Sequence, residues 1–401
     1  MSQPPDPGPI VAGSRDVRYH YMDNLRALAM LAGVFFHAAL AYSPFLHEVW
    51  LGSSPQKSVA MDALAWFSHL FRMPLFFLIA GFFAAYLVGK RGVAGFLRNR
   101  AVRILTPLVV FLPLLWAATV WLVGWALTAV ENPSPLLASI AANLRNPDMP
   151  QQPLTTMHLW FLYLLVQLCL LFGLLARYEL HEHRALAKLC SARFLVFGLP
   201  LLIAPALATQ LVPHPAPEQL QPRLWAIVFY GLFFMTGLVL YRRQQLIDEL
   251  RVYLPWLIVS SVVLYVFIYA EVPRTLSLEA AFALQQGTPV SARSLFVGLL
   301  EACVAVHMTL VCLVVGKALL DTPNRASRYI ADSSYWIYLV HLPLLFWLQF
   351  LLLDVEWGLW TEYAVASLGT LAIGFASYAV LVRPTPIGWL LNGRKPRVTS
   401  R

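Results

Sequence analysis

An apolar stretch over residues 21–42 most constrains what this chain can fold into, because it is long enough to cross a bilayer yet carries three ionisable side chains. On an α-helix, Arg26 and His37 share one face, since eleven residues at about 100° each complete roughly three turns. Asp23 lies one turn before Arg26 on this face, and Gly33 lies one turn before His37. Ionisable groups inside a membrane are costly and usually functional, so we expect a polar face that ends in an imidazole. An anchoring role for Asp23 and Arg26, with His37 simply packed, is the structural alternative.

The composition indicates an all-α, polytopic integral membrane protein. Of the 401 residues, 59% are hydrophobic and 12% are charged, about half the charged fraction of a soluble protein. The net charge of +9 does not indicate nucleic-acid binding, because the basic residues are spread through short loops between apolar spans. The four cysteines show no paired spacing, so we expect no metal site and no disulfide framework. Apolar length predicts about ten transmembrane helices, over residues 22–44, 60–88, 104–130, 156–176, 194–212, 223–241, 253–271, 293–318, 331–353 and 361–383.

The distribution of lysine and arginine predicts which side of the membrane each loop faces. With the N-terminus inside, most basic residues fall on inner segments, and the outer connections hold only Lys57, Arg145, Arg223, Arg274 and Arg293. Both termini are therefore expected in the cytoplasm. The chain then divides into a disordered N-terminal tail (1–20), a transmembrane domain (21–385) and a basic C-terminal tail (386–401). In this orientation His37 lies past the membrane midplane, toward the outside.

A second polar cluster, over residues 96–107, opens the third predicted span at its inner mouth. Arg100 and Arg103 are one turn apart, and two guanidiniums suit a phosphorylated or carboxylate ligand that arrives from the cytoplasm. Pro107 cannot donate to the carbonyl of Arg103, so a polar acceptor is left free there. Anchoring of basic residues at the inner surface explains Arg98 and remains the alternative for the pair.

The second predicted span carries His69 and Arg72. An arginine near the middle of a membrane requires an ionic partner or water, and the candidate partners are Asp62 and Glu301. Structural pairing and the lining of a hydrated cavity both stay open for these residues. Glu301 is also a candidate to orient an imidazole.

Four further polar or aromatic side chains lie in the fourth and ninth predicted spans. His158 and Trp160 open the fourth span at the outer surface, where they either belong to an interfacial belt or line an outer cavity. Tyr338 and His341 are one turn apart in the ninth span and can share a hydrogen bond. A buried polar clasp between helices is the structural alternative for this pair.

The sequence carries no glycine-rich phosphate loop and none of the short motifs of zinc proteases or serine hydrolases. His37 is therefore the titratable group best suited to proton transfer at neutral pH, since it lies on a polar face deep in a span.

These residues resemble the membrane acyltransferase family 3. The resemblance covers about residues 25–385, and its segments occur in the family's order. They are DNLRALAMLAGVFFH, with ten residues between its arginine and its histidine, RMPLFFLIAGFF, the Arg-x-x-Arg motif of Arg100 and Arg103, HLWFLYLL and SYWIYLVHLP. Several motifs in order are far more specific than any one alone.

The resemblance implies a multi-pass enzyme of the bacterial inner membrane that moves an acyl group from acyl-CoA to a hydroxyl of a periplasmic glucan or other glycan. The acyl-CoA donor would dock from the cytoplasm on Arg100 and Arg103, and no tightly bound cofactor is expected. His37 would act as general base or acyl carrier. The first span looks most like family members that transfer succinyl groups, and acetyl remains the alternative. The oligomeric state is left open, a homo-oligomer included.

The supporting roles follow from the same scheme. Asp23 and Arg26 would order the polar face of the first helix, and Glu301 would set the tautomer of the His37 imidazole. The residues expected to bind substrates are His69, Arg72, His158, Trp160 and His341. A transporter or glycan exporter without covalent chemistry is the competing class, because intramembrane charges and a titratable histidine suit it too.

Overall fold

The computed structural model describes residues 19–144, 146, 154–178, 191–284 and 287–392. Within these ranges the chain is helical, apart from loops and one isolated bridge between Thr155 and Gln219. The helices are α1 His20–Leu40, α2 Val59–Arg100, η1 Ala101–Leu105, α3 Thr106–Ala129, α4 Pro135–Asn143, η2 Met157–Leu159, α5 Trp160–Arg177, η4 Phe194–Gly198, α7 Leu199–Leu207, α8 Leu224–Arg242, α9 Gln245–Glu249, η5 Leu250–Tyr253, α10 Leu254–Glu271, α11 Leu278–Leu284, α12 Ala292–Leu319, α13 Arg325–Leu352, α14 Leu359–Ser377, η6 Tyr378–Val382 and α15 Pro386–Asn392.

In the described part of the chain, seven helical segments are long and apolar enough to cross a membrane. One of them runs over Val59–Ala129 and joins α2 to α3, so it holds two of the predicted spans. The residue Gly92 has a positive φ of 67° and breaks α2 just past the end of the predicted span 60–88. The helix α1 is not among the seven, because Asp23, Arg26 and His37 lower its mean hydropathy.

The ten predicted ranges all overlap helices, which confirms the all-α fold class, and the seven long apolar segments support a membrane protein. The number of crossings and the side on which the termini lie stay predictions. The predicted N-terminal tail lies almost entirely outside the described residues, as does the end of the predicted C-terminal tail. The tail 386–401 begins with α15, which returns to pack against α13.

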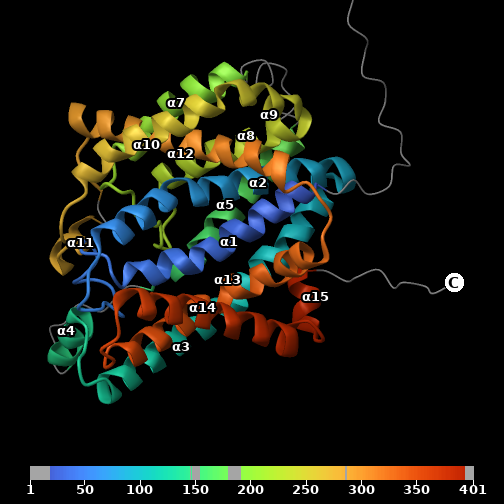
Figure 1. The fold of residues 1–401 in the computed structure, drawn as a ribbon. Helices are drawn as coiled ribbons and strands as arrows, with labels where there is room; N and C mark the ends of the chain where they lie inside the picture. Colours follow the sequence, from blue (N-terminus) through green and yellow to red (C-terminus); the bar gives the residue numbers. More distant parts are fainter. Residues whose placement is uncertain (1–18, 145, 147–153, 179–190, 285–286, 393–401) are drawn as a thin grey trace, which may run out of the picture.

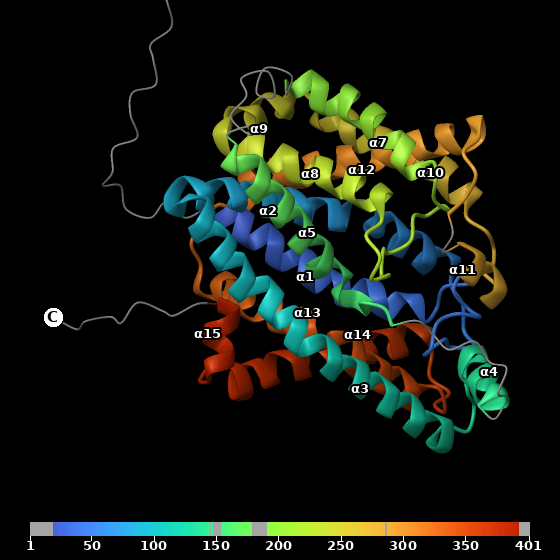
Figure 2. The same cartoon turned by 180° about the vertical axis from the view of Figure 1, so that it is seen from behind.

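Helix α1 is the axis of the molecule. It contacts α2, α12, α13 and α14, and Figures 1 and 2 show it between two groups of helices. The helices α7, α8, α10 and α12 lie on one side, and α3, α13 and α14 lie on the other. The short helices α4 and α11 lie together at one end, which the basic residues predict to face outward. The polar face of α1 is thus enclosed by other helices, where an intramembrane charge is tolerated.

Candidate active site

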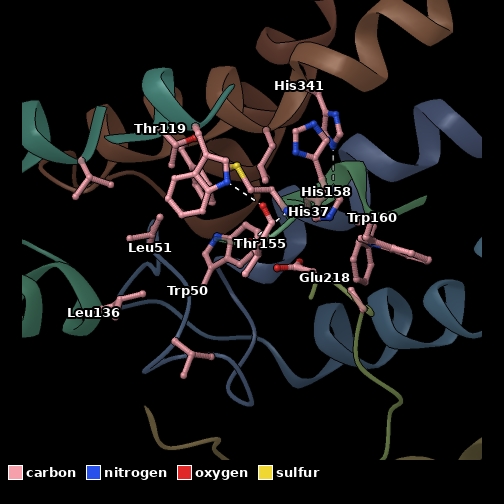
Figure 3. A pocket seen from close by; sticks show the side chains of 18 of the residues that line it. His37, Trp50, Leu51, Thr119, Leu136, Thr155, His158, Trp160, Glu218 and His341 are labelled. Atoms are coloured by element: carbon pink, nitrogen blue, oxygen red, sulfur yellow. Dashed lines mark hydrogen bonds between the residues drawn. The ribbon is translucent and has the colours of Figure 1, made fainter. Parts of the chain in front are cut away.

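A cavity of about 1090 Å³ opens between the helices at the end where α4 lies, and Figure 3 shows part of its wall. Helices α1, α2, α3, α4, α5 and α13 all contribute residues to it. Most of the lining is apolar, with a few polar groups converging on it, as is usual for small-molecule sites. Six residues predicted from the sequence line this single cavity: His37, His69, Arg72, His158, Trp160 and His341.

The half-buried side chain of His37 is held by His341. The Nδ1 atom of His37 lies 3.0 Å from Nε2 of His341, and Nδ1 of His341 lies 2.7 Å from the backbone oxygen of Tyr338. A carbonyl oxygen can only accept, so in the neutral ring His341 Nδ1 carries the proton and His341 Nε2 is the acceptor. His37 Nδ1 must then be the donor to His341. This chain fixes the tautomer of His37 and leaves its Nε2 lone pair free.

The free nitrogen of His37 has no hydrogen-bond partner among the described residues. Around it, the indole of Trp50 lies parallel to the imidazole, with ring planes 9° apart and centroids 6.2 Å apart. The Trp50 indole N–H donates to Gln349 at 3.0 Å, which fixes the indole plane. An unprotonated, oriented imidazole nitrogen that faces a cavity has the properties of a general base.

His158, in η2 just before α5, is anchored on a backbone carbonyl. Its Nε2 donates to the backbone oxygen of Leu339 at 3.0 Å, and its buried Nδ1 has no partner among the described residues. The hydroxyl of Tyr338 donates to the backbone oxygen of His158 at 2.7 Å. Tyr338 and His341 share a hydrogen bond, as the sequence predicted, but it uses the Tyr338 carbonyl, and the Tyr338 hydroxyl bonds to His158 instead.

Arg72 brings a buried positive charge to the cavity, with 6% of the residue exposed. A Cβ atom at Gly33 would lie 3.3 Å from Nη1 of Arg72, so the gap predicted at Gly33 is the place where this guanidinium enters. The guanidinium lies 4.4 Å from the ring centre of Phe36 and donates weakly to the backbone oxygen of Ala32 at 3.4 Å. Its Nε has no hydrogen-bond partner in the described part of the chain.

Neither predicted ionic partner of Arg72 is available. The carboxylate of Asp62 accepts from Trp66 at 3.0 Å and from Tyr269 at 2.7 Å, and it is also bonded to Ser43. The other candidate, Glu301, is held elsewhere, as described below. Among the described residues Arg72 therefore has no carboxylate partner. An anion bound in the cavity would supply the ionic partner that a buried guanidinium requires.

Comparison with known proteins now decides the family. A family model described as an acyltransferase domain matches residues 19–379. The chain belongs to this acyltransferase family. Similar proteins include glucans biosynthesis protein C of Salmonella typhi and of Salmonella typhimurium, each 24% identical over 392 residues that cover 94% of this chain and 96% of the relative. The same protein of Salmonella agona is 24% identical over 406 residues. No solved structure matches the chain.

In this acyltransferase, Glu301 does not contact His37, contrary to the sequence-based expectation. Its Oε1 accepts from the backbone N–H of His214 at 3.1 Å and lies 3.2 Å from Nδ1 of the same histidine. Both residues are fully buried. The backbone oxygen of His214 lies 2.9 Å from Nε2 of His69, whose ring reaches the cavity. Glu301 thus supports the cavity wall through His214 and His69, and His341 takes the place predicted for it beside His37.

The arginine pair of this acyltransferase lies outside the cavity, at the opposite end of α1. Arg103 donates to the backbone oxygen of Asn392 at 3.2 Å, and its own backbone oxygen accepts from the hydroxyl of Tyr335 at 2.9 Å. The acceptor predicted to be free near Pro107 is therefore present, and Tyr335 occupies it. Arg26 pairs with Asp23 at 3.5 Å and lies close enough to Arg103 for the two charges to repel.

Several residues at the site were missed by sequence reasoning. Trp50 and Glu218 line the cavity from loops, and His214 lies behind its wall. Burial raises the pKa of the Glu218 carboxyl from the ordinary 4.5 to about 7. Figure 3 shows this carboxyl near Thr155, on the same wall as His158. The sequence signal for Glu218 and His214 was only that an acid and a histidine occur in one proline-rich loop. No rule of spacing predicts that such a loop packs beside α1.

Proposed function

We propose that this chain transfers an acyl group from a cytoplasmic acyl-CoA to a hydroxyl of a periplasmic glucan or other glycan, across the bacterial inner membrane. Membership of the acyltransferase family supports acyl transfer over transport without covalent chemistry. The observation that carries the mechanism is the chain from the Tyr338 carbonyl through His341 to His37, which leaves His37 Nε2 bare in a cavity.

In the proposed step, His37 Nε2 accepts the proton of the glycan hydroxyl as the hydroxyl oxygen attacks the thioester carbonyl carbon. The new C–O ester bond forms and the C–S bond breaks. The proton then passes from His37 to the departing sulfur, which leaves as the CoA thiol. His37 donates from Nδ1 to His341 throughout the step. The imidazolium that forms is therefore held in one orientation, and this hydrogen bond partly stabilises its positive charge.

His37 as an acyl carrier is the second form of the proposal. In that form Nε2 attacks the thioester carbonyl carbon, the C–S bond breaks and CoA leaves as its thiolate. The sugar hydroxyl then attacks the acyl-imidazole carbon, the C–N bond breaks, and the hydroxyl proton passes to the thiolate. The two forms differ in a measurable way, because only the second gives an acylated protein when donor is present without acceptor. Intact mass of the chain after mixing with acyl-CoA alone distinguishes them.

On the donor side, Arg100 and Arg103 would bind the phosphates of CoA, with the Asp23–Arg26 pair beside them. The cavity extends along α1 from His37 to Ala29, one turn short of Arg26. From Arg26 to His37 the helix rises about 16 Å. The acyl-bearing arm of the donor would therefore thread between helices from the arginines to the cavity floor.

Arg72 supports a succinyl rather than an acetyl group. A succinyl group carries a free carboxylate, and Arg72 is a buried cation on the cavity wall without a carboxylate partner in the described residues. A bidentate guanidinium–carboxylate pair would satisfy both groups in a low-dielectric site. An acetyl group has no carboxylate, so acetyl transfer would leave the Arg72 guanidinium without an ionic partner from the donor.

On the acceptor side, the glycan would enter at the end of the cavity formed by α4 and by the loop that carries Trp50. The flat indole of Trp50 and the nearby His158 and Trp160 would hold a sugar ring near His37. The name of the Salmonella relatives refers to glucans, and we propose a glucan acceptor here on that basis.

The test is a transfer assay on the purified chain in lipid nanodiscs, with succinyl-CoA or acetyl-CoA and a glucose oligosaccharide. An acylated product with one CoA thiol released per ester is the expected result, with succinyl-CoA preferred. Arg72→Ala should reverse that preference, and Arg72→Lys should restore part of it. Binding of donor and saccharide without any covalent product would favour the transporter.

A further inference from the structure

A second cavity, of about 620 Å³, lies beside the active-site cavity. It lies between α7, the start of α8 and a third side formed by Ala281, Gly287 and Thr288. Its volume falls within the roughly 300–1,000 Å³ that is usual for small-molecule sites. Polar side chains and one indole contribute to its lining: Thr209, Gln210, Gln219, Arg223, Thr288 and Trp225.

The two cavities are separated by residues 215–219 and by Ala281 of α11, which lines both. Ala216 lines both of them, while Glu218 faces the active-site cavity and Gln219 faces the second. Within this segment the Glu218 N–H donates to the backbone oxygen of Ala216 at 2.9 Å, which closes a tight turn at Pro217. The segment is fixed, because Thr156 donates twice to the backbone oxygen of Glu218, at 2.7 Å from its N–H and 2.8 Å from its hydroxyl.

Two polar groups in the second cavity have no partner. The Nε of Arg223 and the hydroxyl of Thr288 are buried and make no hydrogen bond within the described residues. Arg223 also forms no ion pair with any described carboxylate. Buried polar groups are normally satisfied, so these two indicate a ligand that supplies hydrogen-bonding atoms.

The chemistry of the second cavity suits a sugar. Hydroxyl groups both donate and accept, so one hexose can bond to a guanidinium, to amides and to a threonine hydroxyl together. The half-buried ring of Trp225 offers an apolar face to a pyranose ring. By contrast, the active-site cavity is lined mainly by apolar side chains, which suit an acyl chain.

We infer that the second cavity is a saccharide subsite for the units of the acceptor next to the one that is acylated. The glycan would run over Ala216, with the reacting unit beside Glu218 and its neighbours against Arg223 and Trp225. The Glu218 carboxyl has no partner in the described part of the chain and is placed to bind a hydroxyl of the reacting unit. This inference rests on the proposed function, since it assigns the acceptor of the same reaction.

The test compares a short and a long acceptor on the purified full-length chain. We expect Arg223→Ala and Trp225→Ala to raise the KM for a glucose hexasaccharide about tenfold or more, because charge-assisted hydrogen bonds and ring contacts are lost. The KM for glucose should rise far less, because glucose occupies only the place of the reacting unit, beside Glu218. Arg274→Ala is the matched control, since Arg274 is exposed in a neighbouring loop and lines neither cavity.

A binding measurement without acyl donor separates this inference from the proposed function. Calorimetric titration of the hexasaccharide into the wild type and Arg223→Ala should show affinity that depends on Arg223, even if no ester forms. Unchanged hexasaccharide binding and KM in Arg223→Ala would overturn the subsite. An equal rise of the KM for glucose and for the hexasaccharide would also overturn the subsite. If added phospholipid restored the activity lost in Arg223→Ala, the cavity would be assigned to a lipid.

Discussion

Two histidine clusters lie beside the cavity, one on each side of the Phe36 ring, and they are built differently. In the first, His37 is held by His341 and keeps one nitrogen free toward the cavity. In the second, His214 is enclosed with Glu301, and both are fully buried. His69 connects the second cluster to the cavity, since its Nε2 bonds to the backbone oxygen of His214 and the two rings lie 4.9 Å apart, centroid to centroid.

The difference separates a reactive histidine from a supporting one. The first cluster is neutral and anchored on a carbonyl, so it fixes a tautomer without burying a charge. The second places a carboxylate beside an imidazole where no substrate reaches, so it joins α2, α12 and the loop before α8. The proposed base, His37, is thus held by another histidine, whereas the carboxylate of Glu301 lies beside a histidine that supports the wall.

The largest expected effect is on the first cluster. His37→Gln keeps a polar side chain but removes the base, so kcat should fall by about 10²–10⁴. His307→Gln is the matched control, because His307 is a buried histidine that bonds to Ser260 and Val196 and does not line the cavity. The measurement is initial rate per amount of folded chain. Loss of rate in both variants to the same degree would contradict the assignment.

The next effect tests the anchoring of His37. His341→Ala frees the His37 tautomer, so kcat should fall by about 10- to 100-fold with little change in KM. Tyr338→Phe keeps the backbone carbonyl and loses only the hydroxyl bonded to His158, so it should be milder. Steady-state kinetics of the two variants give the comparison. A milder loss in His341→Ala than in Tyr338→Phe would contradict the anchoring.

The second cluster should respond in stability instead of rate. Glu301→Gln weakens the contacts to His214, so the free energy of unfolding should fall by about 1–3 kcal/mol. Thermal unfolding in detergent measures this loss, and kcat per folded molecule should stay within a few-fold of the wild type. A large fall in kcat with unchanged unfolding would move Glu301 into the catalytic group.

A smaller effect is expected where Arg72 meets α1. Gly33→Ala places a methyl group 3.3 Å from Nη1 of Arg72, so the guanidinium must shift. We expect a several-fold rise in the KM for a succinyl donor and a smaller change for an acetyl donor. The ratio of the two KM values is the measurement, and equal changes would remove Arg72 from the recognition of a carboxylate.

The smallest effect concerns pH. The pKa of Glu218 is raised to about 7 in the folded chain, so between about pH 4.5 and 7 the folded state holds a proton that the unfolded state has released. Stability should therefore fall as the pH rises through this window. The Glu218→Gln variant has no ionisable group at this position, so its stability should fall less than that of the wild type as the pH rises. Unfolding temperatures measured across the window test this, and identical slopes in both proteins would contradict it.

Sequence reasoning reached the helices and six of the polar and aromatic residues that line the cavity, because both depend on local spacing. The polar face of α1 and the gap at Gly33 follow from helical periodicity. The partners of those residues do not follow from it, since they come from distant helices and loops. Glu301 was predicted beside His37 on chemical type alone, whereas the packing of α12 places it against His214. Trp50 and Glu218 lie in loops whose positions only the assembled helices fix.

The measurement that tests the central claim most directly is mass spectrometry of periplasmic glycans from cells that contain the wild type, His37→Gln, His307→Gln or no protein. Acyl transfer predicts a mass increment, about 100 Da for succinyl or about 42 Da for acetyl, with the wild type and with His307→Gln alone. The same increment with His37→Gln, with comparable protein in the membrane, would contradict His37 as the base. No increment in any sample would contradict acyl transfer to these glycans.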